Sequence, residues 1–248
     1  MIAMVEATAG AKAAEACNRL AMVELIARGV LGGFRLTPEV SALRDAALDR
    51  ILAEVATPRK RFHRHGNDLF AKDFALCRGK LLPCGVEFVD MYSGVPRRLL
   101  ASGGMRQLAG TLGFFARMGG FRPVFELHFD RRLVGAFDSA GYAALYLRIA
   151  GLMALNPHVR GVVSSSWWHD PQLGRISPEL GFIGQYPEGA GARLFRIGEN
   201  ATATTDATRF AARRMELYKG GAYRPCVYTM IWARRDVLAW AQNYRGGP

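Results

Sequence analysis

The sequence predicts a mixed α/β or α+β fold, in which helices cover a central sheet of about five or more strands. Half of the 248 residues are hydrophobic, which is ample for a buried core. From Gly85 onward, short runs rich in Val, Phe, Ile and Tyr alternate with longer stretches at helical spacing. Two amphipathic helical patterns precede this alternation. We therefore expect an N-terminal helical segment, 1–58, followed by an α/β core domain, 59–248.

The N-terminal segment predicts a pair of helices. The stretch 11–28 is rich in alanine and has apolar residues at helical spacing, and the glycines that follow end it. A second helix begins at Pro38, directly after Thr37, a good N-cap residue. Its apolar residues fall on one face: Val40, Leu43, Ala47 and Ile51.

In the core domain the elements follow the order β-α-β-α-β, a long excursion, and then β-α-β-α. Runs of β-branched and aromatic residues predict strands at 86–92, 124–129, 159–167, 193–198 and 227–232. Helical spacing predicts helices at 97–118, 140–155, 206–219 and 235–243. This order indicates one mixed sheet with helices packed on it.

The formal net charge of +12 predicts a surface that attracts an anionic partner. Nucleic acid, a nucleotide, anionic lipid and an acidic carrier protein all fit this charge. The basic run RKRFHRH, 59–65, is either a solvated linker or an anion-binding patch. The four cysteines form no C-x-x-C pair, so neither a zinc site nor a disulfide framework is indicated. Charges interrupt the apolar N-terminus, so we expect a cytoplasmic protein without a secretion signal or transmembrane segment.

The stretch SSSWWHDP, 164–171, gathers hydroxyls, indoles, an imidazole and a carboxylate at the expected end of a strand. Successive side chains of a strand point to opposite faces, so these residues cannot form a catalytic triad by adjacency. Asp170 and the proline after it are typical of a helix start. The alternative is a substrate pocket, because ligands gather beyond the carboxyl ends of strands in open α/β sheets. The pocket residues would be Ser166, Trp167, Trp168, His169 and, from the end of another strand, Asp130.

The expected strand PVFELHFD places polar and apolar residues on opposite faces. Glu126, His128 and Asp130 fall on one face by the two-residue period. This stripe is either the solvated side of an edge strand or a site in which a carboxylate beside an imidazole acts as general base. The pattern H-x-D is a weak indication of metal binding, and we expect no metal.

The turn YSGVPRRLLASGG, 92–104, is a second candidate site. The expected helix 97–118 would carry Arg97 and Arg98 in its first turn, where free N–H groups and the helix dipole favour phosphate. Arginines there oppose the dipole, so they are either on a solvated face or compensated by a bound anion. The anion-binding residues would be Ser93, Gly94, Arg97, Arg98 and Gly103.

This turn resembles the phosphate-binding motif of the GNAT superfamily of acyltransferases, in which Arg or Gln is followed by x-x-G-x-G or x-x-G-x-A. In RLLASG, Arg98 and Gly103 match the first and last positions, and Ala101 replaces the first glycine. The order of elements over 86–155 is also similar to that of the family. The resemblance implies a tyrosine general acid, matched by Tyr146, whereas Ser139 stands where an asparagine is common. It also implies no permanently bound cofactor, with acyl-CoA or acyl carrier protein as co-substrate.

These observations lead to an acyltransferase hypothesis: an acyl group moves from coenzyme A or acyl carrier protein to a small-molecule amine. Glu126 or His128 would be the base and Tyr146 the acid that protonates the leaving thiolate.

The alternative from another class is a basic nucleic-acid-binding module without catalysis. It would use the run 59–65, Arg131, Arg132 and the helix RFAARRMELYK, 209–219. A hydrolase that uses Ser165 or Ser166 with His128 ranks last, because the chain has no G-x-S-x-G elbow.

Overall fold

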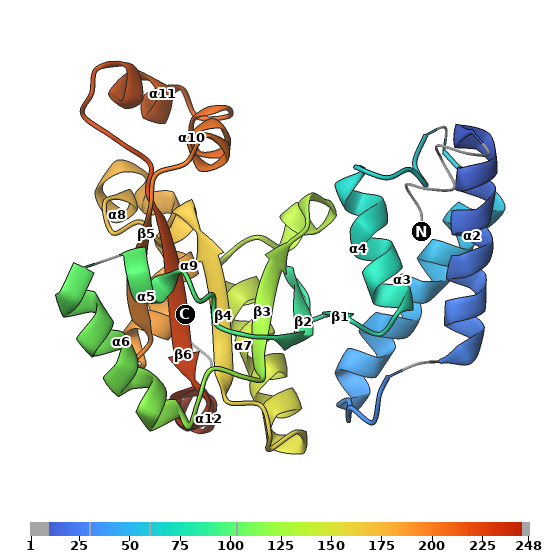
Figure 1. Ribbon diagram of the computed structural model, residues 1–248, viewed down its shortest axis with the longest axis horizontal. Helices are drawn as coiled ribbons and strands as arrows, with labels where there is room; N and C mark the ends of the chain where they lie inside the picture. Colours follow the sequence, from blue (N-terminus) through green and yellow to red (C-terminus); the bar gives the residue numbers. More distant parts are fainter. Residues whose placement is uncertain (1–9, 30, 60, 103, 245–248) are drawn as a thin grey trace.

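The computed structural model describes residues 10–29, 31–59, 61–102 and 104–244. Its centre is one six-stranded sheet in the order β1-β2-β3-β4-β6-β5, covered by helices (Figure 1). This architecture confirms the predicted mixed sheet and the N-terminal helix pair. The strands are β1 Leu81–Pro83, β2 Glu87–Ser93, β3 Val124–Phe129, β4 Gly161–Ser166, β5 Arg193–Gly198 and β6 Val227–Ala233.

The longer helices are α2 Ala11–Arg28, α3 Pro38–Ala56, α4 Asp68–Cys77, α6 Gly104–Met118, α7 Ser139–Leu155, α9 Phe182–Gly189, α10 Ala201–Thr208, α11 Ala212–Lys219 and α12 Arg234–Asn243. The short ones are α5 Leu99–Ser102 and α8 Leu173–Ile176, with the 3-10 turns η1 Arg131–Ala136, η2 Trp167–His169 and η3 Pro178–Leu180. In the described part of the chain, no helix is long and apolar enough to cross a membrane.

The sheet is antiparallel except between β3 and β4, which run parallel and are connected through α7. The β3–β4 ladder is short: only Phe125 pairs with Val162 and Glu126 with Val163. Beyond these pairs the two strands are no longer joined. At this point the rings of Phe129 and Trp168 lie 4.9 Å apart.

Each face of the sheet has its own helices. Phe125 and Leu127 of β3 share a core with Tyr142 and Tyr146 of α7, and α9 and α12 extend this core. On the opposite face, α6 packs over β4, β5 and β6. The same face carries α4 at the β1–β2 end, so α4 and α6 lie at opposite ends of the sheet (Figure 1). The middle of this face, over β2 and β3, is less covered.

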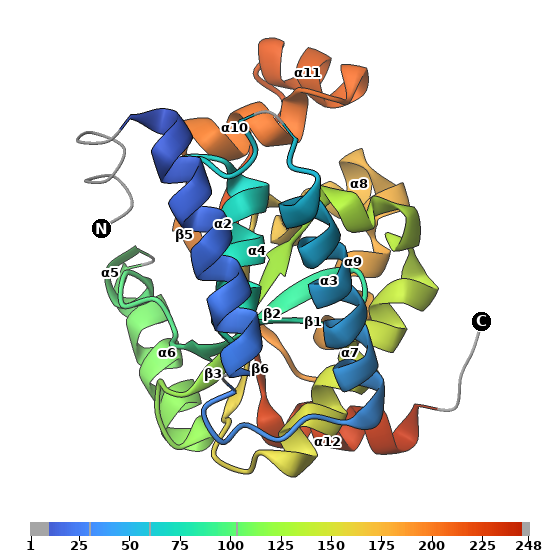
Figure 2. The ribbon, with the colours of Figure 1, turned by 90° about the vertical axis from the view of Figure 1, so that its right-hand side faces the viewer.

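The N-terminal helices pack on the sheet. Figure 2 shows α2 and α3 in front of the sheet with α4 next to both, and α3 and α4 each contact β1. Met22 of α2 and Ile51 of α3 share a core with Leu81 of β1 and Phe88 of β2. Segment 1–58 and the core domain 59–248 therefore have an apolar core in common across the expected boundary.

A buried chain of ion pairs joins these helices to the end of β3. Asp73 of α4 binds Arg50 of α3 at 2.7 Å and Arg132 at 2.9 Å. The Arg132 guanidinium also binds Asp130 at 2.6 Å. Burial raises the pKa of Asp130, but hydrogen bonds from Arg132 outweigh burial and leave the pKa below its ordinary value. Arg132 thus links α4 to the end of β3.

Three expected helices or loops differ from the structure. Asn67 accepts hydrogen bonds from the Leu69 and Phe70 N–H groups and is the N-cap of α4. The sequence analysis did not predict this helix. The expected helix 97–118 is divided into α5 and α6, because Gly104 has φ of +70° at the junction. The expected helix 206–219 is likewise divided, into α10 and α11.

Candidate active site

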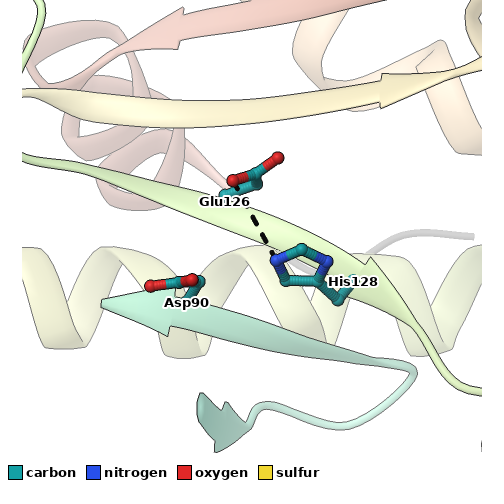
Figure 3. A group of neighbouring side chains, drawn as sticks. All are labelled: Asp90, Glu126 and His128. Atoms are coloured by element: carbon teal, nitrogen blue, oxygen red, sulfur yellow. Dashed lines mark ion pairs between the residues drawn. The ribbon is translucent and has the colours of Figure 1, made fainter. Parts of the chain in front are cut away.

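The predicted polar stripe is present on β3. Glu126 and His128 share the face that α7 does not cover, whereas Phe125 and Leu127 point into the α7 core. Because successive side chains alternate along the strand, the polar residues lie on one face of β3 and the packed apolar residues lie on the other. Figure 3 shows both polar side chains on β3, with Asp90 of β2 beside them.

These side chains line a cavity of about 450 Å³ between α4 and strands β1 to β3. Its floor is Asp90, Glu126 and His128, and the exposed fractions of the last two side chains are 27% and 37%. Ligand can therefore reach both. The other lining residues are Asp68, Ala71, Lys72, Ala75, Lys80, Leu81, Tyr92, Ser93, Gly94 and Arg122.

Glu126 is held by its neighbours in an orientation suited to proton transfer. Ser93 Oγ donates a hydrogen bond to Glu126 Oε2 at 2.5 Å. His128 Nε2 lies 4.0 Å from the same oxygen, as the dashed line in Figure 3 marks. Among the described residues, the second carboxylate oxygen, Oε1, has no hydrogen-bond partner and can accept one from a ligand. A fixed carboxylate beside an imidazole can act as general base and pass the proton on.

Asp90 faces Glu126 directly across the β2–β3 ladder. Two carboxylates at opposed positions repel and destabilise a strand pair. Lys80 Nζ offsets this repulsion at 3.0 Å from Asp90 Oδ2, and the Tyr92 N–H donates to Asp90 Oδ1 at 3.0 Å. The strand pair therefore retains an acidic pair at the cavity floor, a feature with no value for packing.

The same three groups have the donor set of a divalent cation site. One ligand atom each from Asp90, Glu126 and His128 lies within 4.8 Å of the others. Two carboxylates and an imidazole suit ions such as Zn²⁺ or Mn²⁺. A cation would have to displace the Lys80 ammonium and compete with the Ser93 hydroxyl. These compensating contacts favour an acid–base role for the group.

Tyr146 lies on the other side of the sheet. It is fully buried in the α7 core against Trp232, at a ring distance of 5.3 Å, and its hydroxyl has no hydrogen-bond partner. Burial and the nearby Glu87 carboxylate raise the pKa of Tyr146 well above its ordinary value. The structure thus does not bring Tyr146 together with Glu126 and His128, and a thiolate in the cavity is out of its reach.

The expected anion-binding turn is only partly at the site. Ser93 and Gly94 line the cavity, and a Cβ atom at Gly94 would clash with the Arg122 side chain. Arg97 and Arg98 are exposed in a turn before α5, outside the cavity, and α5 has only four residues. They are therefore not in the first turn of a long helix, because the helix expected there begins only at Gly104. Gly103 lies outside the described residues.

The aromatic stretch after β4 serves local structure. Ser166 accepts from the Trp168 N–H at 3.2 Å, and Arg214 stacks over the Trp167 ring at 5.1 Å. Trp168 packs against Phe129, filling the space where β3 and β4 separate. None of these side chains lines the cavity.

His169 is buried with a partner that the sequence did not identify. Its Nε2 lies 2.9 Å from Ser164 Oγ, and burial lowers its pKa to about 4. Asp170 accepts hydrogen bonds from the Gln172 and Cys226 N–H groups, which joins the end of η2 to the residue before β6. The N-cap of α8 is Gln172, so Asp170 is not the helix cap that the sequence indicated. Asp130 is fully buried in the ion pair with Arg132 and does not reach the cavity. The expected pocket residues thus do not form one site.

Comparisons with family models, curated proteins and solved structures found no match to this chain.

The sequence analysis did not identify several of the residues that line the cavity. Asp90 lies opposite Glu126 in the β2–β3 ladder, and only the register of the two strands reveals this. Lys80 and Lys72 come from a turn and a helix that the sequence did not predict. The signal that could have found them was Asn67 followed by the amphipathic run DLFAKDFALC.

Proposed function

We propose that the chain is an acyltransferase that moves an acyl group from a thioester donor to a small-molecule amine, with Glu126 as general base. The observation that carries the proposal is the accessible Glu126 carboxylate, held by Ser93 and placed beside His128 in one cavity.

The chemistry follows from these positions. Glu126 takes a proton from the acceptor ammonium, and the free amine attacks the thioester carbonyl carbon. The C–N bond forms, the C–S bond breaks, and the electron pair leaves on the donor thiolate. The attacking nitrogen loses its second proton, which His128 or water passes to that thiolate, the role that the family resemblance had assigned to Tyr146. Neither a metal ion nor a covalent enzyme intermediate is required.

The test is a transfer assay with the full chain. Acyl-CoA and acyl carrier protein serve as separate donors, a panel of primary amines as acceptors, and mass spectrometry detects the acyl amide. Glu126→Gln should lower the rate by about a hundredfold to ten-thousandfold with little change in melting temperature. Glu199→Gln, at an exposed carboxylate outside the cavity, is the matched control and should keep the wild-type rate.

Two results would contradict the proposal. The first is an absence of transfer from both donors over the whole acceptor panel. The second is a Glu126→Gln variant that works at the wild-type rate, which would show that the carboxylate has no part in the reaction.

The nucleic-acid alternative has one observation in its favour, since Arg131 lies beside the basic segment 61–65 along one cavity. Arg209 and Arg213 of the same alternative are exposed, but two of its other arginines are engaged inside the protein. Arg132 is clamped between Asp73 and Asp130, and Arg214 donates to Ala207 O and Ser177 Oγ. We therefore place it second.

A further inference from the structure

A second cavity, of about 540 Å³, adjoins the first and is strongly basic. Its guanidinium groups come from two segments far apart in the sequence: Arg61 and Arg64 precede α4, and Arg131 follows β3. The other lining residues are His65, Gly66, Asn67, Asp68 and Leu69. The link from Arg132 to Asp73 of α4 brings these two segments together, so the basic cavity lies where the end of β3 meets the start of α4.

Two of the three arginines are uncompensated. Arg64 pairs with Glu15, and Asp68 pairs with Lys72 at 2.6 Å. Among the residues that the structure describes, no acidic side chain pairs with Arg61 or Arg131, and both are exposed. Two like charges that share a cavity repel, and an anion placed between them removes the repulsion. Planar guanidinium groups match the oxygens of phosphate especially well.

The backbone at Arg61 gives independent support. Arg61 has φ of +63°, in the left-handed region, and is the one non-glycine residue of the described chain with a positive φ. Such conformations are costly for a side chain other than glycine and cluster at ligand-binding positions. The site does not depend on the start of α4, because Asn67 Oδ1 already accepts from the Leu69 and Phe70 N–H groups. The arginine side chains are its binding groups.

The two cavities meet at Asp68, which lines both. From there the first cavity follows one side of α4 past Lys72 to Ala75. Along β3, at about 3.3 Å per residue, Glu126 and Phe129 are about 10 Å apart, and Arg131 follows Phe129 by two residues. A ligand that reaches from the arginines to Glu126 is therefore elongated.

We propose that Arg61, Arg64 and Arg131 bind the phosphate of an elongated ligand whose reactive end lies beside Glu126. Within the proposed function, on which this step rests, the ligand is the acyl donor, with its phosphate at the arginines and its thioester beside Glu126. The anion site then lies before α4 and after β3, and not at Arg97 and Arg98.

The test is calorimetric titration of the full chain with inorganic pyrophosphate and, separately, with coenzyme A. Arg61→Ala and Arg131→Ala should each weaken both ligands about tenfold or more, since a charge-assisted contact is lost. Arg98→Ala is the matched control, an exposed arginine outside both cavities, and should bind as the wild type does. Added salt should weaken binding to the wild type more than to Arg131→Ala.

Equal affinities for wild type, Arg61→Ala and Arg131→Ala, or no binding of either ligand, would overturn the proposal. Binding of a single-stranded DNA oligonucleotide that depends on the same arginines and exceeds coenzyme A in affinity would also overturn it and favour the nucleic-acid alternative. Because titration needs no turnover, binding without acyl transfer would refute only the proposed function. Transfer without arginine-dependent binding would refute only this site.

Discussion

Replacement of Glu87 by glutamine should remove a loss of folding stability that the wild type suffers as the pH rises from about 4.5 to about 7. Glu87 is 4% exposed on β2, and Tyr142 OH donates a hydrogen bond to its Oε1 at 2.6 Å. Burial raises the pKa of Glu87 from 4.5 to about 7, although the hydrogen bond from Tyr142 acts in the opposite direction. The folded protein therefore holds the Glu87 proton more tightly than the unfolded chain does.

The sign and size of the effect follow by linkage. Glu87 contributes its full stability below pH 4.5, and this contribution is lost as the pH rises through about 7. A difference of this size corresponds to about 3 kcal/mol of unfolding free energy. Glutamine keeps the acceptor for Tyr142 but cannot ionise. Glu87→Gln should therefore match the wild type near pH 4.5 and exceed it by about 3 kcal/mol at pH 8.

Differential scanning calorimetry at both pH values measures this difference. For a chain of this length, 1 kcal/mol shifts the melting temperature by about 2 to 4 °C, so the gain at pH 8 should be roughly 6 to 12 °C. The exposed Glu199→Gln is the control and should show no such gain. If Glu87→Gln follows the wild type at every pH, the carboxylate is not buried as described and the reasoning is refuted.

Three further predictions concern residues away from the cavity. Tyr146→Phe should leave acyl transfer unchanged and raise stability by up to about 1 kcal/mol in urea titration, because it removes a buried hydroxyl without a partner. Asp73→Asn should destabilise the protein by about 3 kcal/mol in the same assay, because Arg50 and Arg132 lose their shared carboxylate. The pKa of His169 is lowered from 6.5 to about 4, so His169→Gln should remove a loss of about 3 kcal/mol that the wild type suffers as the pH falls through that window. A wild type and a variant with parallel acid denaturation curves would count against the last one.

The parts of the fold that could be predicted are strands and helices whose own residue pattern shows where they begin and which face is buried. β3 was predicted with its bounds intact, because apolar and polar residues alternate along it and only one face is buried. Pro38 and Thr37 likewise marked the start of α3. In both cases the local pattern and the tertiary packing agree.

The candidate site was predictable only on β3. Asp90 became part of it through strand register, and Lys80 through a turn whose position depends on α4. Tyr146 shows the opposite limit. α7 is buried around much of its circumference, so no polar face in the sequence indicates which of its tyrosines points toward a ligand. Whether Asp90, Lys80 and Tyr146 lie at the site depends on how distant elements pack together, which residue types alone do not reveal.

The two ion pairs of Asp73 help to fix the position of α4, whereas the segment before α4 supplies residues to the basic cavity. Arg50 and Arg132 both bind Asp73 of α4, and the buried Phe62 and His63 of the connection before α4 pack on the same helix. That connection supplies Arg61, Arg64 and His65 to the basic cavity but nothing to the surroundings of Glu126. Within the proposed function, substitutions of these three side chains would change which anion is recognised, while the buried Phe62 and His63 and the ion pairs of Asp73 keep α4 in place. Donor preference could then diverge without a loss of the proposed chemistry.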